Sequence, residues 1–347
     1  MRVLVAMSGG VDSSVAAALL WEQGHEIMGA TMKLWGGESD TGCCSVADVD
    51  DARRVAQQLG IVHHVFSFGD DFSSRVVEPY VSAHAAGLTP NPCIECNRHI
   101  KFDRFLQRAS QLGFDAVATG HHARVVQDVA SGRWRLRRGA DRAKDQSYVL
   151  HMLGQAELAR TLLPVGELTK AEVRAVAARL GLRTAAKAES QDVCFITRSS
   201  GRSAFVGARI PLHPGRMVDL DGRPVGSVTA VELVTIGQRR GLGTGGDGAR
   251  RYAVDVDVPG RTVTVGSVDD LLTDSVGLAS CTWVDESPAV GAPVLVQTSA
   301  HGRPMPAVWD GSAVRFADRQ RRVAPGQSVV LYDSADGDDV VGGGIAA

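Results

Sequence analysis

Three serines, two glycines and one aspartate stand close together near the start of the chain, in the segment Ser8-Gly9-Gly10-Val11-Asp12-Ser13-Ser14. An apolar run precedes the segment and a helical pattern follows it, so backbone N–H groups at the helix N-terminus converge there on an anion. The glycines let the backbone approach the anion closely, and Asp12 has the carboxylate that can hold magnesium between phosphates. The segment therefore predicts a nucleotide-phosphate site. The absence of Gly-Lys-Ser/Thr argues against a Walker loop.

Cysteine is the second residue type whose spacing suggests chemistry, and its six positions are Cys43, Cys44, Cys93, Cys96, Cys194 and Cys281. In a long intracellular chain these cysteines do not suggest a disulfide framework, so redox, metal or nucleophilic chemistry is favoured. Cys96 precedes Asn97, which we expect to cap a helix that runs to Leu112. A helix N-terminus lowers the pKa of a nearby thiol, which favours the thiolate of Cys96.

Length and composition bound the class of protein. The chain has 347 residues, 44% hydrophobic and 22% charged, with a formal net charge of −2. These values predict a globular protein of two or three domains and exclude disorder for most of the chain. No run approaches the roughly 18 apolar residues of a membrane span, and the first residues show no signal peptide. We therefore expect a cytoplasmic protein with no membrane partner.

A basic segment lies in the middle of the chain. Residues 98–144 contain 11 Lys or Arg and 4 Asp. The segment includes a predicted hairpin around Ser131-Gly132 with four arginines, Arg133, Arg135, Arg137 and Arg138. Such a ribbon is typical both of an RNA-binding surface and of a solvated edge strand, and charge alone favours neither interpretation.

Strand and helix patterns alternate over the first 200 residues. We expect strands at 2–7, 26–32, 61–66 and 116–119 and helices at 12–23 and 46–59, the helices ending at glycines. Thr169-Lys170-Ala171-Glu172 is a capping box that opens a helix to Leu180. Alternation of this kind predicts an α/β domain, residues 1–200, with a parallel doubly wound sheet.

Beyond residue 200 the hydrophobic period changes toward two, and short Val-rich runs are separated by Gly, Pro and Asp-Gly turns. This pattern is typical of strands. We expect a small β-rich middle domain at residues 201–276 and a C-terminal β-barrel at residues 277–347.

At these motifs the chain resembles the tRNA-specific 2-thiouridylases, a family of PP-loop ATP pyrophosphatases. The matching segments extend over essentially the whole chain: 8–14, 91–102, 118–122, 144–148, 194–196, 235–243 and 342–345. The resemblance implies ATP-dependent 2-thiolation of the wobble uridine in tRNA, with ATP and Mg²⁺ as cofactors. It also implies tRNA acceptors for Lys, Glu and Gln, and a cysteine desulfurase or sulfur-relay protein as a further partner.

The resemblance also implies roles for single residues. The nucleotide site would be formed by Ala6, Met7, Ser8, Gly9, Gly10, Val11, Asp12, Ser13, Met32 and Gly120. Contacts to tRNA would come from Asn91, Pro92, Cys93, His121, Lys144, Asp145 and Gln146. The catalytic residues would be Cys96 and Cys194, with Cys194 carrying a persulfide and a disulfide forming between the two as sulfur is transferred. Cys43, Cys44 and Cys281 match no catalytic position and are interpreted as packing or loop thiols.

Cys93 departs from the family, many members of which carry an aspartate with an acid/base role at this position. Cys93, Cys96 and Cys194 could therefore hold a [4Fe-4S] cluster with one open iron position. Cys93 and Cys96 could instead bind zinc with His99, although no second pair of suitable spacing completes four ligands. Two other functions stay open: a PP-loop synthetase of amidotransferase type, which needs no cysteines, and a non-enzymatic tRNA-binding module.

Overall fold

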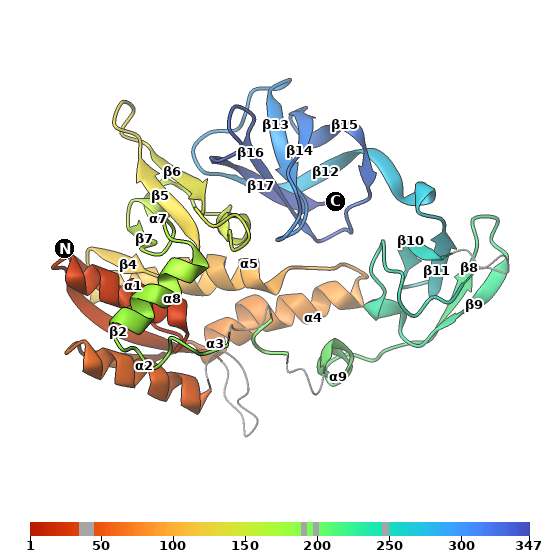
Figure 1. The fold of residues 1–347 in the computed structure, drawn as a ribbon. Coiled ribbons are helices and arrows are strands. Elements are labelled where there is room, and N and C mark those ends of the chain that lie inside the picture. The colour runs from red at the N-terminus through yellow and green to blue at the C-terminus, as the bar shows by residue number, and fades with distance from the viewer. Residues whose placement is uncertain (35–44, 189–192, 197–200, 245–249) are drawn as a thin grey trace.

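The computed structural model describes residues 1–34, 45–188, 193–196, 201–244 and 250–347. Figure 1 shows three parts: an α/β domain, a small sheet at the far end of a long helical segment, and a barrel. This is the fold class that the sequence predicted.

The first domain contains a parallel sheet in the order β3-β2-β1-β4-β7. Its strands are β1 Arg2–Ala6, β2 Glu26–Lys33, β3 His63–Ser67, β4 Ala116–Ala118 and β7 Thr161–Leu162. The chain leaves β1 toward β2 and β3 on one side and later returns to β4 on the other. The sheet is therefore doubly wound, and its topological switch point lies between β1 and β4, where ligands bind in such folds.

Helices cover both faces of this sheet, because alternate residues of each strand point to opposite sides. Val3 and Val5 pack with α1 Val11–Glu22, α2 Val46–Gln58 and α8 Lys170–Arg179. Leu4 packs on the other side with the segment formed by α5 Pro92–Cys96, the π-helical η2 Asn97–Arg104 and α6 Phe105–Gln111. A second helical segment contains α3 Gly69–Phe72, η1 Ser73–Val77 and α4 Glu78–Ala85.

The segment with α5 corrects one prediction. The helix begins at Pro92 and not after Asn97, because the Asn91 side chain accepts a hydrogen bond from the Cys93 N–H at 3.1 Å and Pro92 fits the first helical position. Asn97 is inside the helical segment and donates its amide to the carbonyl of Val149 at 2.9 Å. Cys96 therefore ends α5, and the argument from a helix N-terminus does not apply to it.

The basic segment contains the predicted ribbon, β5 Ala123–Gln127 paired with β6 Trp134–Arg138. It is followed by the 3-10 turn η3 Ser147–Leu150 and the short helix α7 Gln155–Leu158.

The middle domain starts with α9 Gly201–Gly207 and contains a sheet in the order β10-β11-β8-β9. The strands are β8 Gly215–Val218, β9 Pro224–Val228, β10 Tyr252–Asp257 and β11 Thr262–Gly266, with 3-10 turns η4 Val231–Leu233 and η5 Asp269–Leu271. This sheet lies beyond the end of α4 (Figure 1), and the Thr89 hydroxyl reaches that of Thr235 at 3.3 Å.

The C-terminal domain is a closed barrel in the order β12-β15-β14-β13-β16-β17. Its strands are β12 Leu272–Trp283, β13 Pro293–Gln297, β14 Met305–Trp309, β15 Ala313–Arg321, β16 Ser328–Asp333 and β17 Val340–Ala346. The first strand begins at Leu272, ahead of the boundary at residue 277 that the turn signals suggested.

The barrel packs directly on the first domain. Tyr332, Val330 and Val340 are buried in the same hydrophobic cluster as Leu4 and Phe105. The hydroxyl of Tyr148 donates to the carbonyl of Ser328 at 2.7 Å and strengthens this contact.

Gly343 in β17 lies at this contact, where an added Cβ would stand 2.5 Å from the carbonyl oxygen of Val329 and 2.8 Å from the ring of His151. We predict that Gly343→Ala lowers the free energy of unfolding by about 1–3 kcal/mol, since overpacking forces backbone shifts. Gly277→Ala is the matched control, because the nearest atom to its Cβ is 4.0 Å away. Chemical denaturation measures both variants; equal losses of stability would contradict the predicted close packing.

Candidate active site at the switch point

The serine- and glycine-rich segment forms the turn between β1 and α1. Gly9 has a φ of +70°, and a Cβ at this position would overlap the carbonyl oxygen of Asp48, so only glycine fits. The Ser8 N–H donates to the Ser13 hydroxyl at 3.1 Å, and the Ser14 hydroxyl donates to the carbonyl of Gly10 at 2.8 Å. The turn is thus held in shape by its own side chains.

Gly120 lets the backbone that follows β4 approach this turn closely. It follows β4, and an added Cβ would lie 2.5 Å from the backbone nitrogen of Ser13. The backbone after β4 is therefore packed against the first turn of α1. A contact between Gly120 and a nucleotide stays a prediction.

The Asp12 carboxylate, in the first turn of α1, has two side-chain partners, Lys170 and His122. Lys170 donates to both carboxylate oxygens at 2.7 Å, and His122 Nε2 lies 3.2 Å from Oδ1. Burial alone would raise the pKa of Asp12, but the hydrogen bonds and charges of His122 and Lys170 outweigh it and lower the pKa below its ordinary value. The carboxylate is consequently ionised at neutral pH.

Lys170 and His122 were not among the site residues that the sequence predicted. Lys170 was noted only as part of a capping box, although it is the first residue of α8, where the helix dipole disfavours a cation. A lysine in that place is a signal for an anionic partner outside the helix. His122 lay in a quoted motif, but its neighbour His121 was preferred.

His121 is buried, with 8% of its surface exposed, and its side chain is held by Thr119 and Lys101. Burial lowers the pKa of His121 well below its ordinary value, and the charges of Lys101 and His122 lower it further. Because a lysine ammonium has only donors, Nε2 of the neutral ring accepts from Lys101 at 3.5 Å and Nδ1 donates to Thr119 at 2.7 Å. A contact between His121 and tRNA stays a prediction.

The other predicted nucleotide residues line the base of the turn. Ala6, Met7 and Val11 are buried in the sheet and helix packing. Thr31 donates its hydroxyl to the carbonyl of Met7 at 2.7 Å, which fixes the start of the turn. Met32 is half-buried near the carboxyl end of the neighbouring strand β2. Direct contacts between these residues and a nucleotide stay predictions.

The structure brings Cys96 and Cys194 to one hydrophobic cluster although they are far apart in sequence. Cys96 belongs to the cluster that contains Phe72, Tyr80 and Phe195, and Cys194 packs against it. Tyr80 and Phe195 meet edge to face at 5.6 Å between ring centroids.

Cys93 lies near the same aromatic group. Burial raises the pKa of Tyr80, Arg202 opposes this effect, and the charge of Cys93 adds to it. Within the described part of the chain, however, no three Cys, His, Asp or Glu side chains converge as metal ligands. The iron–sulfur cluster on the three cysteines and the zinc site with His99 both stay predictions.

The remaining cysteines fall into two groups. Cys281 is half-buried in β12, and burial raises the pKa of its thiol, as expected for a packing residue. Cys43 and Cys44 lie outside the described residues.

The residues expected to contact tRNA have structural partners of their own. Asn91 caps α5, and Pro92 is its first residue. The Asp145 carboxylate accepts from Arg138 at 2.9 Å and from the backbone N–H groups of Gly139 and Ser147. Contacts of these residues with RNA, and of Cys93, Lys144 and Gln146, stay predictions.

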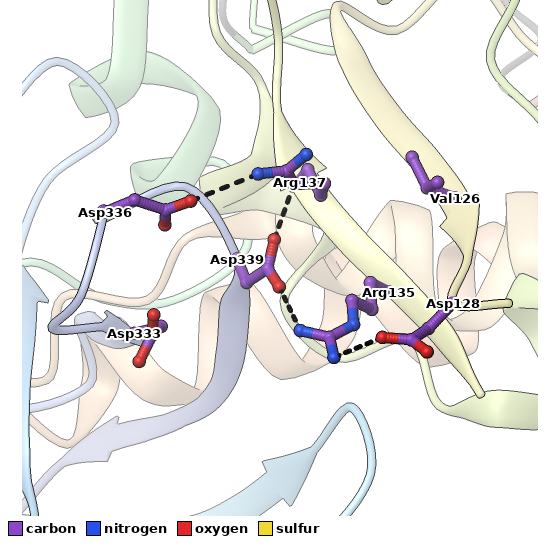
Figure 2. Close-up of a pocket in the computed structure, with 7 residues that line it drawn as sticks. All are labelled: Val126, Asp128, Arg135, Arg137, Asp333, Asp336 and Asp339. Carbon is purple, nitrogen blue, oxygen red and sulfur yellow. Dashed lines mark hydrogen bonds and ion pairs between the residues drawn. The ribbon is translucent and has the colours of Figure 1, made fainter. Parts of the chain in front are cut away.

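The arginines of the ribbon pair with carboxylates of the barrel and with Asp128 of the ribbon's own turn. Figure 2 shows Arg135 between Asp339 and Asp128, and Arg137 between Asp336 and Asp339. Arg133 pairs in the same way with Asp285. The side chains of Arg133 and Arg135 stay 49% exposed beside these partners, so both interpretations that charge left open stay predictions.

A glycine-rich turn at the switch point of a doubly wound sheet, with Asp12 at the following helix and no Walker lysine, defines an ATP-utilising domain of the PP-loop class. Residues 1–198 match the family described as tRNA methyl transferase HUP domain, residues 203–267 its PRC-barrel domain, and residues 276–346 the aminomethyltransferase beta-barrel domain.

Two relatives extend the match to the whole chain. A tRNA-specific 2-thiouridylase MnmA from Chloroflexus aggregans is 48% identical over 99% of this chain and 97% of its own length. The protein of the same name from Heliobacterium modesticaldum is 44% identical over 99% of this chain and 91% of its own. The chain belongs to the tRNA-specific 2-thiouridylase family.

Among solved structures, a tRNA thiolase from Methanococcus maripaludis with its [4Fe-4S] cluster aligns with 60% of this chain and 64% of its own at 19% identity. The TM-score of this alignment is 0.37. In the ranges that the structure describes, no helix is long and apolar enough to cross a membrane.

The Asp12 carboxylate is held by Lys170 and His122 in the nucleotide turn. We predict that Asp12→Asn abolishes pyrophosphate release from ATP in the presence of tRNA, because the amide loses the charge that Lys170 and a magnesium ion recognise. The affinity for tRNA should stay unchanged in a filter-binding assay. Asp50→Asn, which removes an exposed carboxylate paired with Arg53, is the control and should behave as wild type. Unchanged turnover in Asp12→Asn would refute the assignment of the nucleotide turn.

Proposed function

We propose that this chain uses ATP to convert the wobble uridine of tRNA to 2-thiouridine and acts as a tRNA-uridine 2-sulfurtransferase. The full-length relatives support thiolation, whereas two of the matching domain families are described by methyl transfer. The alignment with the Chloroflexus aggregans relative covers 99% of the chain and therefore includes the whole site.

The position of Met32 is the observation that carries the proposal. Met32 packs against the cluster that contains Leu4 at the sheet and also against the cluster that contains Cys96. It therefore lies between the strand that leads into the nucleotide turn and the two cysteines. An adenylated uridine bound beside Met32 would have the nucleotide turn on one side and the thiols of Cys96 and Cys194 on the other. Its activated C2 carbon would then be within the same region as the sulfur donor.

In the first step, the uridine O2 attacks the α-phosphate of ATP and pyrophosphate leaves. The hydroxyls of Ser8 and Ser13 and the N-terminus of α1 surround the phosphates. Asp12 would hold a magnesium ion, which supplies neutralising charge when bound.

In the second step, the outer sulfur of a Cys194 persulfide attacks C2, and AMP leaves with the former O2. The Cys96 thiolate then attacks the Cys194 sulfur, so the persulfide bond breaks, the outer sulfur stays on C2 and a disulfide forms. In the alternative order, Cys96 first releases the outer sulfur as hydrosulfide, which attacks C2. An external thiol reduces the disulfide before the next turnover in both cases.

The partners follow from this chemistry. A cysteine desulfurase or sulfur-relay protein loads Cys194, and the substrates are tRNAs for Lys, Glu and Gln in the cytoplasm. An amidotransferase-like synthetase would need no sulfur carrier, and the meeting of Cys96 and Cys194 at one cluster favours sulfur transfer over it.

Replacing single cysteines separates the two halves of the reaction. We predict that Cys96→Ser and Cys194→Ser each abolish 2-thiouridine formation and leave pyrophosphate release intact, because neither thiol takes part in adenylation. Cys93→Ser should retain thiolation, and the barrel residue in Cys281→Ser is the matched control. Mass spectrometry of tRNA nucleosides after reaction with a persulfide donor measures each product.

The cluster hypothesis makes the opposite prediction for Cys93. An anaerobic preparation with about four irons per chain, together with an inactive Cys93→Ser variant, would overturn the persulfide route.

A further inference from the structure

The loop of residues 139–147 (the 139–147 loop) joins the ribbon to η3 and holds both partners of Asp12. The Asp141 carboxylate accepts the backbone N–H of Lys170 at 2.9 Å. Gln146 makes two hydrogen bonds to the backbone of His122: its N–H donates to the carbonyl at 2.8 Å, and its Oε1 accepts the N–H at 2.9 Å. The loop therefore fixes the places from which Lys170 and His122 reach Asp12.

One buried ion pair fastens the same loop to the barrel, next to a more exposed pair between Arg142 of the loop and Asp338 of the barrel at 2.6 Å. Asp145 and Arg138 have side chains that are 4% and 10% exposed, and they meet at 2.9 Å. Arg138 also donates to the carbonyl of Gly337 at 2.9 Å and to Gln297 Oε1 at 2.8 Å. Its guanidinium stands 3.7 Å from the centre of the Tyr332 ring.

The Asp145 carboxylate is fully occupied by these internal contacts. Besides Arg138 it accepts the N–H groups of Gly139 and Ser147, both at 3.0 Å, and the Ser147 hydroxyl at 2.9 Å. Four donors from within the protein therefore satisfy this buried carboxylate.

We propose that Asp145 is a positioning residue for the adenylation step: through Arg138 it anchors the 139–147 loop to the barrel, and the loop holds Lys170 and His122 against Asp12. The seating of the barrel thereby sets the geometry of a carboxylate in another domain. This inference rests on the proposed function, because its readout is the release of pyrophosphate.

The test replaces Asp145 with asparagine, which keeps the shape and removes the charge. A misplacement of about 1 Å in a catalytic group can cost about 100-fold in rate, so we expect kcat for pyrophosphate release at saturating tRNA to fall at least about tenfold. The Kd for tRNA should stay unchanged, since all four hydrogen bonds of the carboxylate are to groups within the protein. Thermal unfolding monitors whether the variant is folded.

A second variant avoids the buried pair. Gln146 is exposed, so Gln146→Leu removes the bond from Oε1 to the His122 N–H without disturbing Arg138. It should show the same fall in kcat, which keeps the proposal testable if Asp145→Asn does not fold. Asp339→Asn is the control: Asp339 pairs with Arg135 and Arg137 at the same domain contact but does not touch the 139–147 loop.

The outcomes are distinct. A lower kcat with unchanged tRNA affinity in both test variants, and wild-type kinetics in Asp339→Asn, supports the proposal. A change in the Kd for tRNA with unchanged kcat, or wild-type kinetics in both test variants, overturns it. Failure of the wild-type protein to release pyrophosphate would instead refute the proposed function.

Discussion

The buried guanidinium of Arg138 is the interaction on which the arrangement of the ribbon, the 139–147 loop and the barrel depends. Breaking a buried ion pair by removing one partner costs about 3–5 kcal/mol, because the other charge is left unsatisfied away from water. Arg138 avoids that cost with groups from separate segments: Asp145, the Gly337 carbonyl and Gln297. These segments are therefore held in one geometry.

Local patterns predicted most of the fold. The doubly wound sheet and the barrel follow from hydrophobic periods of 3.6 and 2, which depend only on neighbours in sequence. The turn at Gly9 was also readable, because a glycine pair between a strand and a helix has few alternative uses. The predicted cap at Asn97 was wrong. Asn91 caps the helix instead, and the Asn97 side chain donates to the carbonyl of Val149, which is distant in sequence.

The rest of the site depends on contacts that no local pattern contains. Lys170 lies 158 positions from Asp12, and Arg137 lies 202 positions from Asp339. A capping box around Lys170 and a basic ribbon at Arg137 were both visible in the sequence. The partners of these residues could not be predicted, because the tertiary fold decides which distant carboxylate a charged side chain meets.

The sharing of one hydrophobic cluster between Leu4 and the strands β16 and β17 has a consequence for biosynthesis. The first domain leaves the ribosome long before Tyr332 and Val340, which complete its core. Until those strands are made, the surface around Tyr148 and His151 lacks its barrel partners, and exposed apolar surface of this kind favours aggregation. A ribosome that stalls within the barrel therefore leaves the first domain with an incomplete core.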